Sequence, residues 1–124
     1  MTWLMVAIGG ALGSMGRFGL GHVLARFDTF PYGTFLANVL GSLAIGFCAG
    51  LLNAEQRHRP AGLFLMTGIC GGFTTFSTFS LQTMELLEKH AWIKAGGNIL
   101  LTVAFCLFGT WLGFLFGQAL RKAV

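Results

Sequence analysis

Four long apolar stretches constrain this chain more than any other feature of its sequence. They cover residues 2–24, 34–52, 62–87 and 93–120, and each can cross a bilayer as a helix, which takes about 20 residues. Hydrophobic residues make up 55% of the chain, charged residues only 10%, and the mean hydropathy is +0.75. These values exclude an ordinary soluble domain. The sequence predicts an all-α integral membrane protein with one domain over residues 1–124, and the first stretch, which lacks the features of a signal peptide, is expected to stay in it.

Short polar connectors separate the four stretches, and an even number of crossings puts both chain ends on one side of the membrane. Positive residues in short loops normally mark the cytoplasmic side. The side with the termini carries four basic residues and the opposite side three, namely Arg57, Arg59, Arg121 and Lys122 against Arg26, Lys89 and Lys94. So small a difference allows insertion in both orientations, with an antiparallel homodimer as the natural product. A single, weakly biased orientation is the alternative.

The third stretch is interrupted at residues 71–80, which read GGFTTFSTFS. Glycine is a poor helix former, and Ser and Thr side chains compete with the helix for backbone hydrogen bonds. We therefore expect the helix to unwind near Gly71-Gly72 and to restart near Thr75. Residues three apart would then stack, which places Phe76 over Phe79 and forms a row of hydroxyls beside the rings.

Isolated polar residues occur inside the other three stretches. Arg17 in the first stretch indicates a function or a specific partner, or else a side chain that reaches the membrane surface. Asn38 in the second stretch can bond a neighbouring helix or present its amide to an anion. Asn98, Thr102 and Cys106 recur every four residues in the fourth stretch and form a polar strip on one helix face. A narrow permeation path shared by these groups would account for all of them.

Small residues at intervals of three and four mark faces where helices approach closely. Such residues include Gly9 and Gly13 in the first stretch, and Gly46 and Gly50 in the second. The fourth stretch repeats the pattern towards its end with Gly109, Gly113 and Gly117.

The chemistry available inside the membrane favours binding of an anion over catalysis. The three cysteines are isolated and lack metal-ligand spacing, and no nucleophile and base pair occurs in the apolar stretches. Hydroxyls and amides donate hydrogen bonds, and an aromatic ring has a positive edge. The acidic residues lie in connectors or near the ends of stretches, and the basic residues are loop anchors that do not indicate nucleic acid.

The run from Gly68 to Ser80 closely resembles the signature of the Fluc fluoride channels, also called CrcB. Three further patterns fall in the order that this family shows: Gly9-Gly10-x-x-Gly13-x-x-x-Arg17, Gly33-Thr34-x-x-x-Asn38, and the strip that begins at Asn98. The resemblance therefore runs through all four stretches.

The resemblance implies a dual-topology, antiparallel homodimer in the bacterial inner membrane, with two pores that export fluoride passively from the cytoplasm. It implies that Phe76 and Phe79 form a box of rings along the pore, and that hydroxyls and the Asn38 amide form a polar track. Together with the polar strip, the predicted pore residues are Phe76, Phe79, Asn38, Ser77, Thr78, Ser80, Asn98 and Thr102.

The resemblance also implies a structural sodium ion at the centre of the dimer, bound by the backbone carbonyls of Gly71 and Thr74 from each subunit. An unwound turn frees carbonyl oxygens, and hard cations take oxygen ligands. The chain departs from the family at two positions. Gln82 stands where many relatives have glutamate, and Cys106 stands where a hydroxyl residue is frequent.

Two other classes of membrane protein are alternatives. Small multidrug-resistance exporters are also short and span the membrane four times, but their proton coupling needs an acidic residue in the first span, where this chain has Arg17 and no acid. A non-transporting assembly protein would explain the glycine faces and would leave the ordered Phe and hydroxyl motif without a purpose.

Overall fold

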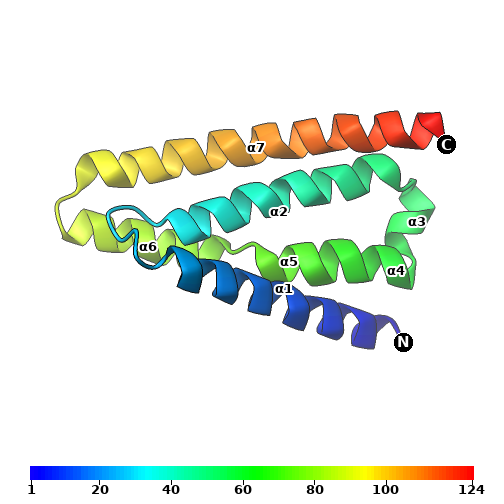
Figure 1. Ribbon diagram of the computed structural model, residues 1–124, viewed down its shortest axis with the longest axis horizontal. Helices are drawn as coiled ribbons and strands as arrows, with labels where there is room; N and C mark the ends of the chain where they lie inside the picture. Colours follow the sequence, from blue (N-terminus) through cyan, green and yellow to red (C-terminus); the bar gives the residue numbers. More distant parts are fainter.

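The computed structural model describes residues 1–124 and contains helices but no strands. Four of its spans are long and apolar enough to cross a membrane, which confirms the predicted class. They are α1 (Thr2–Leu24), α2 (Tyr32–Leu51), a third span from Pro60 to Glu88, and α7 (Trp92–Ala123). The spans lie roughly along one long axis, with both termini at the same end of the molecule (Figure 1).

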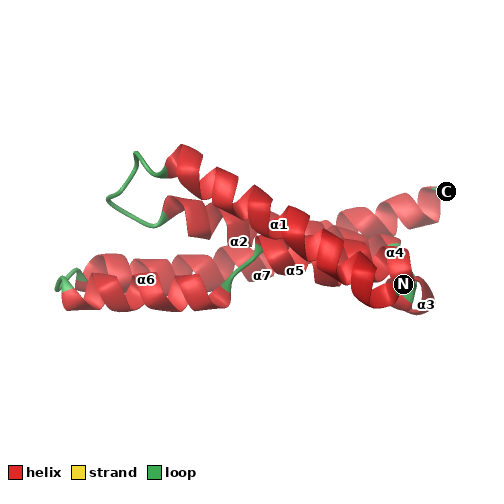
Figure 2. Cartoon of the chain, turned by 90° about the horizontal axis from the view of Figure 1, so that it is seen from below, coloured by secondary structure: helices red, strands yellow, loops and turns green.

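The third span is a series of helical pieces interrupted once. It runs through α4 (Pro60–Leu63), the π-helix η1 (Phe64–Cys70), α5 (Gly71–Phe73) and α6 (Phe76–Glu88). Thr74 and Thr75 between α5 and α6 have extended backbones, with ψ of 155° and 117°. Figure 2 shows this break as a short loop near the middle of the molecule. The predicted interruption within residues 71–80 and the restart near Thr75 are confirmed, although the helix continues through Gly71-Gly72, near which it was expected to unwind.

Close packing against α1 explains why Gly72 does not unwind the helix. A Cβ atom on Gly72 would lie 2.5 Å from the carbonyl oxygen of Gly10, and one on Gly68 would lie 2.9 Å from the Cα of Gly9. Gly68 and Gly72 are four residues apart, so both lie on the face that α1 crosses. The absence of a side chain therefore serves contact between two backbones, and this contact outweighs the low helix propensity of glycine.

A second close pair joins α2 to α7. A Cβ atom on Gly113 would lie 2.8 Å from the backbone nitrogen of Phe47, and one on Gly50 would lie equally close to the nitrogen of Gln118. The fold thus consists of two glycine-mediated helix pairs, α1 with the first half of the third span and α2 with α7. The break in the third span lies where these two pairs meet, beside Gly41 of α2.

A short helix that the sequence analysis treated as a polar connector follows α2. It is α3 (Ala54–His58), and a reciprocal capping box fixes its start. The side chain of Asn53 accepts a hydrogen bond from the backbone of Gln56 at 2.8 Å, and the side chain of Gln56 accepts one from the backbone of Asn53 at 2.9 Å. Arg57 donates to the carbonyls of Ala49 and Leu52, so its charge lies at the negative end of α2.

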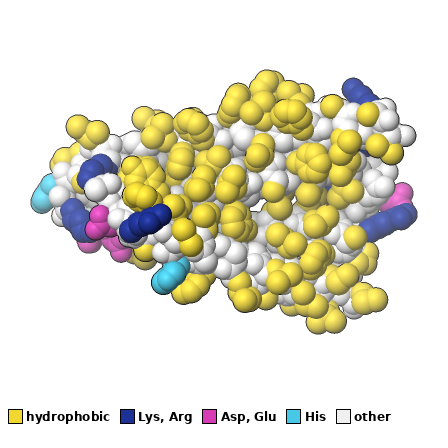
Figure 3. Space-filling model, in the orientation of Figure 1, with side chains coloured by type: hydrophobic (Ala, Val, Ile, Leu, Met, Phe, Trp, Pro, Cys, Tyr) yellow, Lys and Arg dark blue, Asp and Glu magenta, His cyan; other side chains and the backbone are white.

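The surface of the molecule matches that of a protein immersed in lipid. Apolar side chains cover its middle, whereas charged side chains gather toward the two ends and the visible histidines lie toward the left end (Figure 3). Large apolar residues such as Phe18, Leu100 and Phe116 are exposed over this middle region. Such an extensive apolar surface is incompatible with water, so the chain is a multi-pass membrane protein.

Two adjacent glycines on α1 provide a test of the crossing with the third span. Gly9→Ala would place a Cβ 2.5 Å from the carbonyl oxygen of Phe64, whereas Gly10→Ala meets no atom within 4 Å. We expect Gly9→Ala to destabilise the protein by about 1–3 kcal/mol, as overpacking does, and Gly10→Ala to have little effect. Thermal unfolding in detergent measures the difference, and equal melting temperatures for the two variants would contradict the crossing.

Candidate functional site

The break in the third span is held by the side chain of one asparagine. Asn38, buried on α2, donates from Nδ2 to the carbonyl oxygen of Thr75 at 3.0 Å and accepts at Oδ1 from the backbone nitrogen of Thr75 at 2.7 Å. The two backbone groups of Thr75 are thereby satisfied where the helix cannot satisfy them. Of the two interpretations of Asn38 left open by the sequence, the structure shows bonding to a neighbouring span.

Two residues of α1 donate hydrogen bonds to the last helical turn before the break in the third span. Arg17 donates from Nε to the carbonyl oxygen of Gly72 at 3.3 Å, and the hydroxyl of Ser14 donates to the same oxygen at 3.4 Å. A carbonyl at the C-terminal end of a helix carries partial negative charge, which a cation stabilises. The guanidinium of Arg17 is therefore directed at the break and is half-buried.

Thr75 also begins α6 as its N-cap. Its hydroxyl oxygen accepts from the backbone nitrogen of Thr78 at 3.2 Å, and it lies 3.2 Å from both the Thr78 and the Ser77 hydroxyls. The hydroxyl of Ser80 donates to the carbonyl of Phe76 at 3.0 Å. Within the chain, these hydroxyls therefore bond to the start of α6 and to one another.

A cavity of about 350 Å³ lies beside the break, between α2, α6 and α7. Phe76 and Phe79 both line it, with ring centroids 5.5 Å apart and planes inclined by 49°. Phe79 is buried, with 7% of its surface exposed, whereas Phe76 is 78% exposed. The polar lining comes from Asn38, Ser42, Thr74, Thr75 and Thr102, with Cys70 and Cys106, and includes no charged side chain.

The predicted pore residues divide into two groups in this structure. Phe76, Phe79, Asn38 and Thr102 meet at the cavity, whereas Ser77, Thr78, Ser80 and Asn98 are not among its lining residues. Asn98 is buried behind the cavity wall, where its Nδ2 donates to the hydroxyl of Thr83 at 3.0 Å. The sequence analysis did not select Thr83; its position four residues after Phe79 was the available signal.

Backbone oxygens are the groups at the break that fit a cation. The structure contains no cluster of three His, Cys, Asp or Glu side chains that could hold a metal ion. The carbonyl oxygen of Thr74 accepts no hydrogen bond within the chain, and the backbone N–H of Thr75, the ordinary donor to Gly71, bonds instead to Asn38. Both oxygens therefore suit a hard cation such as Na⁺, which takes oxygen ligands.

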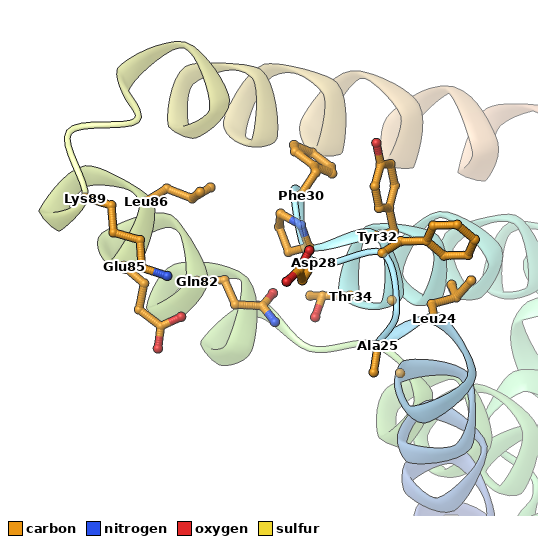
Figure 4. A pocket seen from close by; sticks show the side chains of 14 residues that line it. Leu24, Ala25, Asp28, Phe30, Tyr32, Thr34, Gln82, Glu85, Leu86 and Lys89 are labelled. Atoms are coloured by element: carbon orange, nitrogen blue, oxygen red, sulfur yellow. The ribbon is translucent and has the colours of Figure 1, made fainter.

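A second cavity, of about 260 Å³, lies at the end of the molecule between the loop that follows α1 and the end of α6. Gln82 lines it together with Asp28, Glu85 and Lys89, and the side chains of Gln82 and Asp28 point toward one another (Figure 4). The Oε1 atom of Gln82 is buried and has no hydrogen-bond partner. A second carboxylate at this position would add a like charge beside Asp28, and the neutral amide avoids that cost.

Comparison with known proteins places the chain among proteins of similar length. Residues 4–114 match the family model described as CrcB-like protein, Camphor Resistance (CrcB). The protein named fluoride-specific ion channel FluC of Opitutus terrae is 48% identical over 97% of this chain and 95% of its own length. Proteins of the same name from Methylocella silvestris and Rhodospirillum rubrum are 47% and 43% identical, over 98% and 100% of this chain and 97% and 100% of their own lengths.

Asn38→Leu tests the amide at the break. This substitution leaves the N–H and C=O of Thr75 without partners, and each buried unsatisfied group costs about 1–3 kcal/mol. We expect a lower melting temperature and faster hydrogen exchange at the amide of Thr75. Asn53→Ala is the control, because it removes an asparagine side chain from the exposed cap of α3, where the loss costs about 1 kcal/mol and leaves the break intact. Unchanged exchange at Thr75 in Asn38→Leu would contradict the assignment.

Proposed function

This chain belongs to the CrcB family, and on that basis we propose that it is a fluoride-selective channel that lowers cytoplasmic fluoride by passive export. The observation that carries the proposal is the cavity beside the break, where two phenyl rings and an asparagine amide meet without any charged side chain. Many weak contacts with no opposite charge replace part of the hydration of an ion without trapping it, which conduction requires.

The donors at this cavity suit a small anion. The NH₂ group of Asn38 carries two hydrogens, of which one is donated to Thr75, so the second is available on the cavity side. The hydroxyl of Thr102 also lines the cavity, but its single hydrogen is donated to Asn98 at 3.3 Å, which leaves the Asn38 amide as the side-chain N–H donor there. The rings of Phe76 and Phe79 contribute positive edges. A passive path of this kind needs no catalytic group.

We extend the proposal to an antiparallel homodimer in the bacterial inner membrane, with two pores that both subunits line. The exposed ring of Phe76 and the exposed side chain of Ser77 support this arrangement, because a second copy would cover them. Ser77, Thr78 and Ser80 lie on α6 next to Phe76, and they would reach a pore only if the partner subunit completed its wall. The nearly equal basic charge of the two ends of the molecule is compatible with insertion in both orientations.

The sodium ion that the resemblance implies belongs to the same proposal. The carbonyl oxygens of Gly71 and Thr74 from both subunits would hold it. When bound, the ion supplies a fixed positive charge to the two interrupted helices. Asn38 frees the carbonyl oxygen of Gly71 by taking the N–H of Thr75, and the break itself leaves the carbonyl oxygen of Thr74 without a partner.

Fluoride efflux from liposomes tests the proposed function. The purified protein should release fluoride rapidly, and it should release chloride negligibly from matched liposomes, with ion-selective electrodes as the readout. A well-folded protein that releases neither ion, or both equally, would overturn the proposal.

Phe76→Ile and Phe79→Ile extend this test to the rings. Each removes one aromatic edge and keeps an apolar side chain, so we expect fluoride release to slow by tenfold or more, which corresponds to a loss of about 1.4 kcal/mol at the barrier. Phe116→Ile, at an exposed position of α7 that does not line the ring cavity, is the control and should behave as wild type. Full activity of both ring variants would count against the rings as part of the path.

A further inference from the structure

A line of three buried hydrogen bonds connects the wall of the ring cavity to the backbone of Phe79. The hydroxyl of Thr102 donates to Oδ1 of Asn98 at 3.3 Å, Nδ2 of Asn98 donates to the hydroxyl of Thr83 at 3.0 Å, and this hydroxyl donates to the carbonyl oxygen of Phe79 at 2.8 Å. Asn98 is 1% exposed, and Thr83, Thr102 and Phe79 are each 7% exposed. The line crosses from α7 to α6 without contact with solvent.

The directions of these hydrogen bonds fix the donor and acceptor roles of Thr83 and Asn98. The single hydrogen of the Thr83 hydroxyl is directed at Phe79, so a lone pair faces α7 and accepts from Asn98. Both polar atoms of the Asn98 amide are engaged, one with Thr83 and one with Thr102. Asn98 is absent from the cavity lining, so its amide supports neighbouring residues and does not face the space where an ion would pass.

The segment with the two rings is held at two points by other helices. At its start, Asn38 of α2 bonds both backbone groups of Thr75. One turn beyond Phe79, Asn98 of α7 bonds the side chain of Thr83. Phe76 and Phe79 lie between these two points, directly after the break that separates α6 from the rest of its span. Two asparagines from two different helices thus fix the position of the ring segment.

We propose that Thr83 and Asn98 are positioning residues for fluoride passage, which fix the Phe79 ring at the cavity wall by bonding α6 to α7. This inference rests on the proposed function and assigns Asn98 a part different from direct contact with the ion. The Thr83 hydroxyl orients the Asn98 amide, and Asn98 in turn accepts the hydrogen of Thr102.

Thr83→Val and Thr83→Ser in the full-length protein test the proposal by fluoride efflux from liposomes. Valine keeps the shape of threonine and lacks the hydroxyl, so we expect fluoride release to slow by about tenfold, the upper range for loss of one hydrogen bond between membrane helices. Serine keeps the hydroxyl and should restore the rate to within about twofold. Thr29→Val is the matched control, because it makes the same change at an exposed threonine that does not line the ring cavity, and it should leave the rate unchanged.

Two outcomes would overturn the positioning proposal while leaving the proposed function intact. In the first, the wild type conducts and Thr83→Val conducts equally well. In the second, Asn98→Leu lowers the rate as much in the Thr83→Val background as in the wild type, which would show that Asn98 acts independently of Thr83. If Thr83→Val does not fold, Thr83→Ala and Thr83→Ser provide the same comparison, since they differ only by the hydroxyl. Failure of the wild type itself to release fluoride would instead overturn the proposed function.

Discussion

The requirement that every backbone polar group in lipid find a partner governs this structure. A helix meets it automatically, and an interruption of a helix does not. The third span is interrupted at Thr74 and Thr75, and side chains of other spans supply partners for Gly72 and Thr75, whereas the carbonyl oxygens of Gly71 and Thr74 accept no hydrogen bond. Asn38 bonds both groups of Thr75, while Arg17 and Ser14 cover the carbonyl of Gly72. The first role of these three polar residues is therefore to bond the backbone at the break, and any contact with an ion is additional.

Close helix packing brings these partners within reach. Side chains as short as those of Asn and Ser bond a neighbouring backbone only when the two helices nearly touch, which the paired glycines of α1 and the third span allow. Beyond the break, α6 forms a separate helical segment of the third span. The glycine faces thus make possible the hydrogen bonds that the polar residues form between helices.

The sequence predicted the four spans and the interruption because long apolar runs and a Gly and hydroxyl motif are local signals. The helix continues past Gly72, near which it was expected to unwind, because the low helix propensity of this glycine is outweighed by contact with α1, which is a tertiary effect. The partners of Asn38 and Asn98 could not be predicted either, since their hydrogen bonds join residues 37 and 15 positions apart. Thr83 was not predicted as a site residue because a single threonine on a helix gives no signal in the sequence, and its partner Asn98 lies on another helix. Spacing predicts which residues share a helix face, and the packing of the helices decides what that face meets.

The conformation of Thr75 has a consequence for which side chain can stand opposite it. With φ of −152° and ψ of 117°, this residue has the geometry of a β-strand, and its N–H and C=O bond to one carboxamide as they would to the C=O and N–H of the opposite residue in an antiparallel pair. The side chain of Asn38 therefore takes the place that a neighbouring strand would have beside the extended backbone of Thr75. Only a carboxamide side chain presents an N–H donor and a C=O acceptor side by side, as the backbone does. Glutamine would hold that group one methylene too far from its helix, so asparagine is the one residue that imitates a peptide at this distance.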